Sequence, residues 1–246
     1  MKIAVIADIH GNDLALEAVL ADIDAQGINE IVNLGDHFSG PLNAARTADI
    51  LIGRSMPAIR GNHDRYLLTF DPEHMGTSDR AAHDELESRH IDWLAALPET
   101  LTYRDTLFLC HGTPQSDETY WMEGLTAEGV VHMAERKAIE RFAEGIDCPV
   151  ILCGHTHVPR VVRLGDGRLL VNPGSVGCPG YDDDQPVAHK VETGSPDARY
   201  AIVECAADSW SVTFRCVSYD YMAMARLAAR RNRPVWAKAL ATGFLD

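Results

Sequence analysis

The chain has 246 residues, 46% of them hydrophobic, and a formal net charge of −14. This length and apolar content are sufficient for a large hydrophobic core, and we expect a single domain over residues 1–246. The acidic charge argues against a broad basic surface for nucleic acid or an anionic membrane. The net charge does not exclude a phosphorylated substrate, because bound cations can reverse the sign of the charge locally.

Six cysteines occur without any CxxC pair, several of them in apolar stretches typical of strands. We therefore expect reduced thiols, with neither a disulfide framework nor a thiolate metal site. The apolar stretch Ile3–Ala7 is too short for a signal peptide, and no other stretch reaches membrane-spanning length. The sequence thus predicts a cytoplasmic protein that is not associated with a membrane.

The first quarter of the chain alternates short apolar strands with helices. Strands are expected over 2–7, 30–34 and 56–59, and helices over 13–25 and 41–53. This alternation is typical of parallel strands joined by right-handed crossovers, whose carboxyl ends form the ligand-binding edge of a sheet. The polar residues that follow these strands would meet at that edge: Asp8, His10, Asp36, Asn62 and His63.

The rest of the chain mixes helices with hairpins. Helices are expected over 79–97, 126–143, 218–231 and 235–245, and a strand over 150–153. Hairpins are expected from 100–103 with 106–109, 161–164 with 168–171, and 200–205 with 210–217. Residues 178–198 are rich in proline, glycine and aspartate and are interpreted as a long loop.

Five polar blocks each follow an apolar strand. They are Asp8-x-His10, Gly35-Asp36, Gly61-Asn62-His63-Asp64, His111-Gly112 and Gly154-His155-x-His157. The blocks offer carboxylate, imidazole and amide oxygen ligands without a thiolate, which suits manganese, iron or zinc. There are more such ligands than one ion can use, so the pattern favours two divalent metals.

The five blocks, in this order, resemble the signature of the calcineurin-like metallophosphoesterase family. The stretch Asn172-Pro173-Gly174-Ser175-Val176-Gly177 further resembles its small bacterial and archaeal branch. The resemblance covers nearly the whole chain. It implies an α/β fold, a four-layer α/β/β/α sandwich with two mixed sheets, and hydrolysis of a phosphomonoester or phosphodiester.

The resemblance also implies a role for each residue of the blocks. One metal would be held by Asp8, His10 and His157, the second by Asn62, His111 and His155, with Asp36 between them. A hydroxide held between the metals would attack phosphorus in line, and His63 would protonate the leaving oxygen. Asn62 and His63 would also contact substrate, Asp64 would orient His63, and Asn12 would support the loop of the first block. Manganese is favoured, with iron, zinc and nickel as alternatives.

Structural alternatives were weighed for the same residues. Asp8 could cap a helix, Asp36 could belong to a turn and His111 could be a core histidine, but all five blocks together favour the metal site. His37 is interpreted as exposed, as are His74, His83, His90 and His132. Tyr120 and Trp121 could stack on a substrate base or fill the core. His189 and Lys190 are placed in a solvated loop, and Trp236 and Phe244 in core or dimer contacts.

On charge grounds, a phosphorylated small molecule or nucleotide is favoured as the substrate over nucleic acid. The alternatives are a serine/threonine protein phosphatase of the same fold and a non-catalytic protein-binding scaffold, as in the retromer subunit with this fold. The presence of His63 favours the enzyme, because a scaffold has no need of a general acid. A homo-oligomer is left open.

Overall fold

The computed structural model describes residues 1–207 and 209–246. The helices are α1 (Asp13–Ala25), α2 (Ala44–Arg54), α3 (Asn62–Thr69), α4 (Thr77–His83), α5 (Ser88–Ala95), α6 (Arg136–Phe142), α7 (Tyr221–Arg230) and α8 (Pro234–Thr242). The strands are β1 (Lys2–Ile6), β2 (Ile31–Asn33), β3 (Leu101–Tyr103), β4 (Leu107–Leu109), β5 (Glu123–Leu125), β6 (Val131–Met133), β7 (Val150–Leu152), β8 (Arg160–Arg163), β9 (Leu169–Asn172), β10 (Gly180–Asp183), β11 (His189–Glu192), β12 (Ala198–Ala206) and β13 (Ser209–Val217). None of the helices in these two ranges is long and apolar enough to span a membrane.

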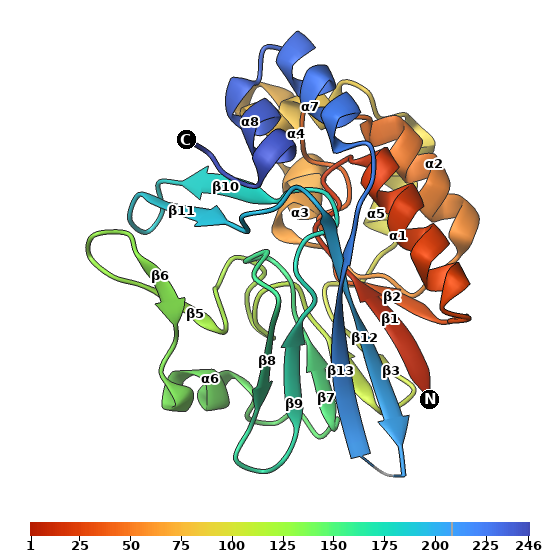
Figure 1. Ribbon diagram of the computed structural model, residues 1–246, viewed down its shortest axis with the longest axis vertical. Coiled ribbons are helices and arrows are strands. Elements are labelled where there is room, and N and C mark those ends of the chain that lie inside the picture. The colour runs from red at the N-terminus through yellow and green to blue at the C-terminus, as the bar shows by residue number, and fades with distance from the viewer. Residues whose placement is uncertain (208) are drawn as a thin grey trace.

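Two mixed sheets form the centre of the fold (Figure 1). The first has the strand order β13-β12-β1-β2 and the second the order β3-β4-β7-β9-β8. Within them β1 runs parallel to β2, β4 to β7 and β7 to β9, whereas the remaining pairs are antiparallel. Two small hairpins, β5–β6 and β10–β11, lie outside these sheets.

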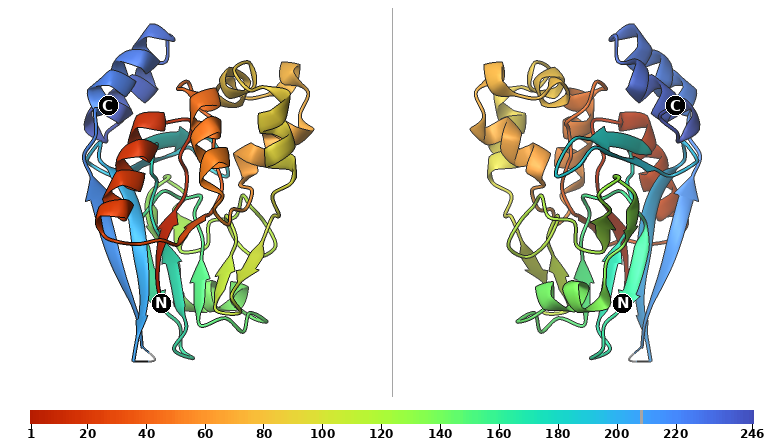
Figure 2. Two further views of the ribbon diagram at one scale, coloured as in Figure 1. Left: turned by 90° about the vertical axis from the view of Figure 1, so that its right-hand side faces the viewer. Right: turned by 90° about the vertical axis from the view of Figure 1, so that its left-hand side faces the viewer.

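The layers follow from the alternation of apolar side chains along the strands. On β1, Ala4 and Ile6 pack with Leu16 and other residues of α1, whereas Ile3 and Val5 pack against the second sheet. Since successive side chains of a strand point to opposite faces, one sheet is apolar on both sides. The outer face of the second sheet packs with residues around α6. The predicted α/β/β/α sandwich is confirmed, and Figure 2 shows the sheets and helices from two sides.

Four segments differ from the sequence-based expectation. The helix predicted over 126–143 is instead the hairpin β5–β6 followed by the short α6. The Thr126 hydroxyl accepts the backbone N–H groups of Glu128 and Val130, and Gly129 adopts a positive φ of 77°, so the chain turns there. The loop predicted over 178–198 contains β10 and β11, which pair from Gly180 with Glu192 onward.

The helix predicted over 79–97 is divided into α4 and α5. The imidazole Nδ1 of His90 accepts the Glu87 N–H at 3.1 Å and thereby caps the start of α5. His90 is buried by this contact, so its assignment to a solvent-exposed face was wrong. The strand predicted over 56–59 is extended but pairs through a single bridge between Asn33 and Ala58.

Helix α1 is joined to the first sheet by a polar contact. The Asp22 carboxylate accepts hydrogen bonds from the Arg215 guanidinium at 2.7 and 3.1 Å and from the Tyr200 hydroxyl at 2.6 Å. The Arg215 contacts, followed by that of Tyr200, lower the pKa of Asp22 below its ordinary value, although partial burial opposes this.

Replacing Asp22 by Asn should therefore destabilise the protein at neutral pH by about 1 kcal/mol, because two charge-assisted contacts are lost. The stabilisation by the Asp22 carboxylate is fully present above its pKa in the unfolded chain, near 3.8. It is lost as the pH falls through the lower pKa that Asp22 has in the folded protein. Urea unfolding at pH 7 should show a lower free energy of unfolding for Asp22→Asn than for wild type, and this difference should disappear in acid. An equal gap at both pH values would contradict this account. Asp24→Asn, at an exposed pair with Arg54, is the matched control and should have a smaller effect.

Candidate metal centre

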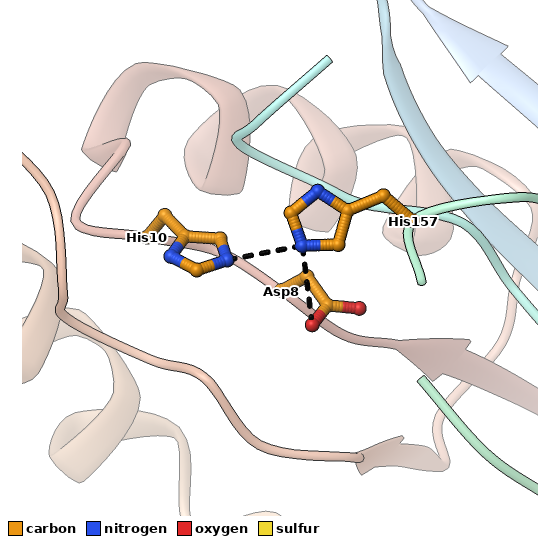
Figure 3. A group of neighbouring side chains, drawn as sticks. All are labelled: Asp8, His10 and His157. Atoms are coloured by element: carbon orange, nitrogen blue, oxygen red, sulfur yellow. Dashed lines mark hydrogen bonds and ion pairs between the residues drawn. The ribbon is translucent and has the colours of Figure 1, made fainter. Parts of the chain in front are cut away.

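The polar blocks meet at the carboxyl-terminal edge of the two sheets, in two groups of side chains. In the first group, ligand atoms of Asp8, His10 and His157 all lie within 4.8 Å of one another. The Nε2 atoms of His10 and His157 are 3.1 Å apart, and His157 Nε2 lies 3.5 Å from Asp8 Oδ1. Figure 3 shows the Asp8 carboxylate and the His10 ring, from the loop after β1, directed at the His157 ring, from the loop after β7.

The second group consists of Asp36, His111 and His155, again within 4.8 Å. The Nε2 atom of His111 lies 3.2 Å from Asp36 Oδ2 and 3.1 Å from Asn62 Oδ1. The same Asp36 oxygen lies 4.0 Å from His10 Nε2, in the first group. Asp36 therefore lies between the two groups, where a carboxylate that bridges two ions would have to be.

Backbone contacts fix which nitrogen of each histidine faces the centre. The Nδ1 atoms of His10, His111 and His157 bond to backbone carbonyl oxygens of Ser39, Leu34 and Cys178 at 2.7, 2.7 and 2.9 Å. A carbonyl oxygen only accepts, so Nδ1 carries the hydrogen and, in the neutral ring, Nε2 presents a lone pair to the centre. Carbonyl partners of this kind are typical of metal-binding histidines.

His155 is oriented in the opposite sense. Its Nε2 donates to the backbone carbonyl of Glu118 at 3.0 Å, which leaves Nδ1 as the atom with a free lone pair.

The unsatisfied atoms of the centre also suit a bound cation. Asp8 Oδ2 is buried and has no hydrogen-bond partner in the described part of the chain. Two imidazole lone pairs 3.1 Å apart, at His10 and His157, repel each other unless a positive charge is near. Carboxylate and imidazole ligands are those that divalent transition metals bind, so the residues present fit such ions.

The histidines of the centre differ in pKa, because burial lowers some of these pKa values and nearby carboxylates raise others. Burial, reinforced by His157, lowers the pKa of His10 to about 4, and burial with His111 lowers that of His155 to about 4. Burial acts in the same direction on His111, but the charge and hydrogen bond of Asp36, the charge of Asp8 and the Leu34 carbonyl together outweigh it and raise the pKa of His111 to about 10. The centre thus holds positive charge even when only protons supply it.

The ligand loops adopt an unusual backbone conformation. Five of the ten non-glycine residues with positive φ in the described ranges belong to this centre, namely Asp8, His10, Asp36, His155 and His157, at φ between 51° and 68°. Left-handed conformations of this type cost on the order of 1 kcal/mol each and persist where the surroundings enforce them. Their concentration here indicates that the fold holds these side chains in place against local preference.

Gly61 is required by a close approach. A Cβ at this position would collide with the carboxylate of Asp36. The glycine therefore allows the loop before α3 to pass directly beside the central ligand.

Residues 172–177 hold two of the ligand loops together. The Ser175 hydroxyl donates to the Asp8 carbonyl at 2.7 Å, and the Gly177 N–H donates to the same carbonyl at 3.1 Å. The Asn172 side chain donates to the Gly154 carbonyl at 2.7 Å, in the loop of His155 and His157. Asn12 caps α1, and its side-chain amide also donates to the Gly177 carbonyl at 3.0 Å.

His63 is paired with a residue that sequence reasoning did not select. Its Nδ1 lies 2.7 Å from Oδ1 of Asp79, in α4, and Asp79 is 4% exposed. Placement in the pocket disfavours the charged ring, but Asp36 and then Asp79 raise the pKa of His63 to about 9. Asp79 lies 16 residues along the chain and was interpreted only as the start of a helix, so no local pattern could identify it.

The orienting role predicted for Asp64 was wrong. The Asp64 carboxylate accepts the backbone N–H groups of Asp36, His37 and Gly61 at 2.8, 3.0 and 2.9 Å, and it pairs with His37 Nδ1 at 2.7 Å. His37 is fully buried by this pair, so its interpretation as exposed was also wrong. Asp64 is thus an internal support for the loop that carries Asp36.

Comparison with known proteins identifies the family. The sequence profile described as "Calcineurin-like phosphoesterase superfamily domain" matches residues 1–194. The chain belongs to this superfamily. It is therefore an enzyme that hydrolyses phosphate esters, and the family is metal-dependent.

Three similar proteins illustrate the relationship. The sequence is 28% identical over 200 residues to "Uncharacterized protein MJ0912" of Methanocaldococcus jannaschii, a match that covers 72% of this chain and 76% of that protein. A crystal structure of a metallophosphoesterase from Sphaerobacter thermophilus matches with 25% identity and a TM-score of 0.75, covering 99% of this chain and 100% of the other. The hypothetical protein PH1004 of Pyrococcus horikoshii has the same fold, with 20% identity, a TM-score of 0.73 and coverage of 100% and 99%.

The phosphoesterase has a pocket of about 1070 Å³ beside its candidate metal centre. Tyr120, Tyr181 and Trp236 line it, whereas Trp121 is a core residue. His189 is buried and bonds to the Tyr120 hydroxyl at 2.8 Å, so its placement in a solvated loop was wrong. Trp236 packs edge-on against His10, with 6.1 Å between ring centroids, and Phe244 is exposed.

The supporting role of Asp64 can be tested by measuring the stability of a variant. Asp64→Asn should destabilise the enzyme by about 3 kcal/mol, because an amide group would face four buried donors in place of a carboxylate. The measurement is urea unfolding of the metal-free protein. Asp71→Asn, at a position 86% exposed, is the control and should change stability little. If Asp64→Asn were as stable as wild type, the proposed support of the Asp36 loop would be wrong.

Proposed function

We propose that this phosphoesterase uses two divalent metal ions to hydrolyse a phosphomonoester or phosphodiester of a small molecule or nucleotide. The observation that supports this best is that the two groups of ligands meet at Asp36, which belongs to the second group and lies 4.0 Å from His10 Nε2 of the first. Asp8, His10 and His157 would hold one ion, and Asn62, His111 and His155 the other. Manganese is the metal we favour, with iron, zinc and nickel as alternatives.

Two divalent ions bound there would supply Lewis acidity toward the phosphate and an activated water for in-line attack. Asp8 and Asp36 are the two carboxylates of the ligand set, so two divalent ions would leave a net positive site. Such a site attracts a phosphate even in a protein with a net charge of −14.

His63 is the residue that we assign to proton transfer. Asp79 accepts the hydrogen of Nδ1, so the other ring nitrogen, Nε2, is available to donate a proton to the leaving oxygen. His63 lines the pocket together with Asn62, which would place both beside a bound phosphate. The Asp79 carboxylate favours the protonated form of this ring, as a general acid requires.

The pocket supports a small substrate. Its volume of about 1070 Å³ is in the range of small-molecule sites, and Glu118, Asp182 and Asp183 contribute negative charge to its lining. An acidic lining of this kind disfavours a long nucleic acid, which would have to bring several phosphates past it.

Removal of metal should abolish activity. Wild-type protein treated with a chelator and desalted should no longer hydrolyse bis(p-nitrophenyl) phosphate, and Mn²⁺ should restore the rate. The rate of nitrophenol release measures this directly, with magnesium as a comparison ion. Full activity in demonstrably metal-free protein would exclude the proposed chemistry.

The role of His63 can be tested through the leaving group. His63→Gln and Asp79→Asn should each lower kcat about 100-fold for substrates with alkyl leaving groups and much less for nitrophenyl esters, which need no proton. Because Asp79 acts through His63, Asp79→Asn should add little to the His63→Gln variant. Additive losses in the double variant, or equal losses for both leaving groups, would contradict the assignment.

A further inference from the structure

One permanently charged cation lines the pocket. Among the described lining residues Arg233 is the sole arginine or lysine, and it stands in a lining that also contains Glu118, Glu123, Asp182 and Asp183. Two of these carboxylates have arginine partners outside the lining: Glu123 contacts Arg160 at 2.7 Å, and Glu118 contacts Arg65 at 3.0 Å.

Arg233 itself has no carboxylate within ion-pair distance in the described ranges. Its Nη2 donates to the Ser78 hydroxyl at 2.9 Å, which leaves further guanidinium N–H groups free. The side chain is half-buried, and burial lowers its pKa below the ordinary value without a compensating anion. Partial burial of an unpaired guanidinium is costly, and a bound anion would remove that cost.

The hydroxyl of Ser39 is a second unpaired donor in this pocket. Ser39 is 1% exposed, and its Oγ has no hydrogen-bond partner among the described residues. The Ser39 segment lies against that of Ser78, because the Gly40 N–H donates to the Ser78 carbonyl at 3.2 Å. Arg233, Ser78 and Ser39, which all line the pocket, are therefore linked through these contacts.

This part of the pocket lies on the side of the general acid. Ser78, the partner of Arg233, directly precedes Asp79, whose carboxylate holds His63. Trp236, three residues after Arg233, packs against His10 of the metal centre. Arg233, the N-cap residue of α8, is thus linked through Ser78 to the segment that holds His63.

We propose that Arg233, with Ser78 and Ser39, binds a second phosphate carried by the leaving group of the substrate. The inference rests on the proposed function and narrows its substrate class to esters whose leaving alcohol is itself phosphorylated. The metal centre would bind the phosphate that is hydrolysed and the guanidinium the phosphate that departs with the alcohol. Arg233 lies beyond residues 1–194, so the cation of this site would come from the C-terminal segment, whereas Ser39 and Ser78 lie in the part that matches the family profile.

The test compares adenosine 5′-monophosphate with adenosine 3′,5′-bisphosphate, as competitive inhibitors of bis(p-nitrophenyl) phosphate hydrolysis by the manganese-loaded enzyme. Whichever phosphate of the bisphosphate occupies the metal centre, the other belongs to the leaving alcohol. Arg233→Gln should raise the inhibition constant of the bisphosphate about tenfold, the loss of one charge-assisted contact, and that of the monophosphate less than twofold. Arg233→Lys should give an intermediate value.

Arg230→Gln is the matched control, because it removes the same charge from an exposed position in the neighbouring α7. It should leave both inhibition constants unchanged, and thermal unfolding should show that all variants are folded. Equal weakening of both nucleotides by Arg233→Gln, or no weakening of either, would overturn the proposal. If wild type does not hydrolyse the chromogenic ester, the proposed function fails separately, and calorimetric titration of both nucleotides still tests Arg233.

Discussion

The central constraint on this structure is the candidate metal centre, where the lone pairs of buried imidazole and carboxylate groups face one another. The Nε2 atoms of His10, His111 and His157 and the carboxylates of Asp8 and Asp36 meet in a region almost closed to solvent. Carbonyl partners fix a hydrogen on Nδ1, on the far side of each ring, so in the neutral rings the atoms that face inward are acceptors. Such a group is unfavourable without positive charge, and a chain of this size has no structural need for it. The centre is therefore best understood as a site for cations.

The fold maintains this unfavourable arrangement with a rigid frame. Parallel strands in both sheets bring the ligand loops to one edge, and the apolar layer between the sheets fixes that edge. Each ligand loop is then held by buried groups from elsewhere in the chain. Asp64 holds the backbone around Asp36, Ser175 holds that of Asp8, and Asn172 holds the loop of His155 and His157. These contacts offset the left-handed conformations of the ligands themselves.

Sequence patterns predicted the layers and the convergence of the ligands, because these depend on local apolar stretches and on polar residues directly after them. They failed where a partner is distant. Asp79 reaches His63 only because α4 folds back over the pocket, and His37 is buried only because Asp64 lies opposite it. The hairpin β10–β11 was not predicted, because residues 178–198 have a composition typical of loops. Asp64 was predicted as the partner of His63 because the two are adjacent in sequence. In the structure the Asp64 carboxylate instead contacts the backbone of Asp36.

The most direct test of the central claim is an anomalous diffraction measurement on crystals grown with Mn²⁺. The account predicts two peaks, about 3.5–4 Å apart. One would be ligated by Asp8, His10 and His157, the other by Asn62, His111 and His155, and Asp36 would contact both. A single peak, or peaks that do not share Asp36, would contradict it.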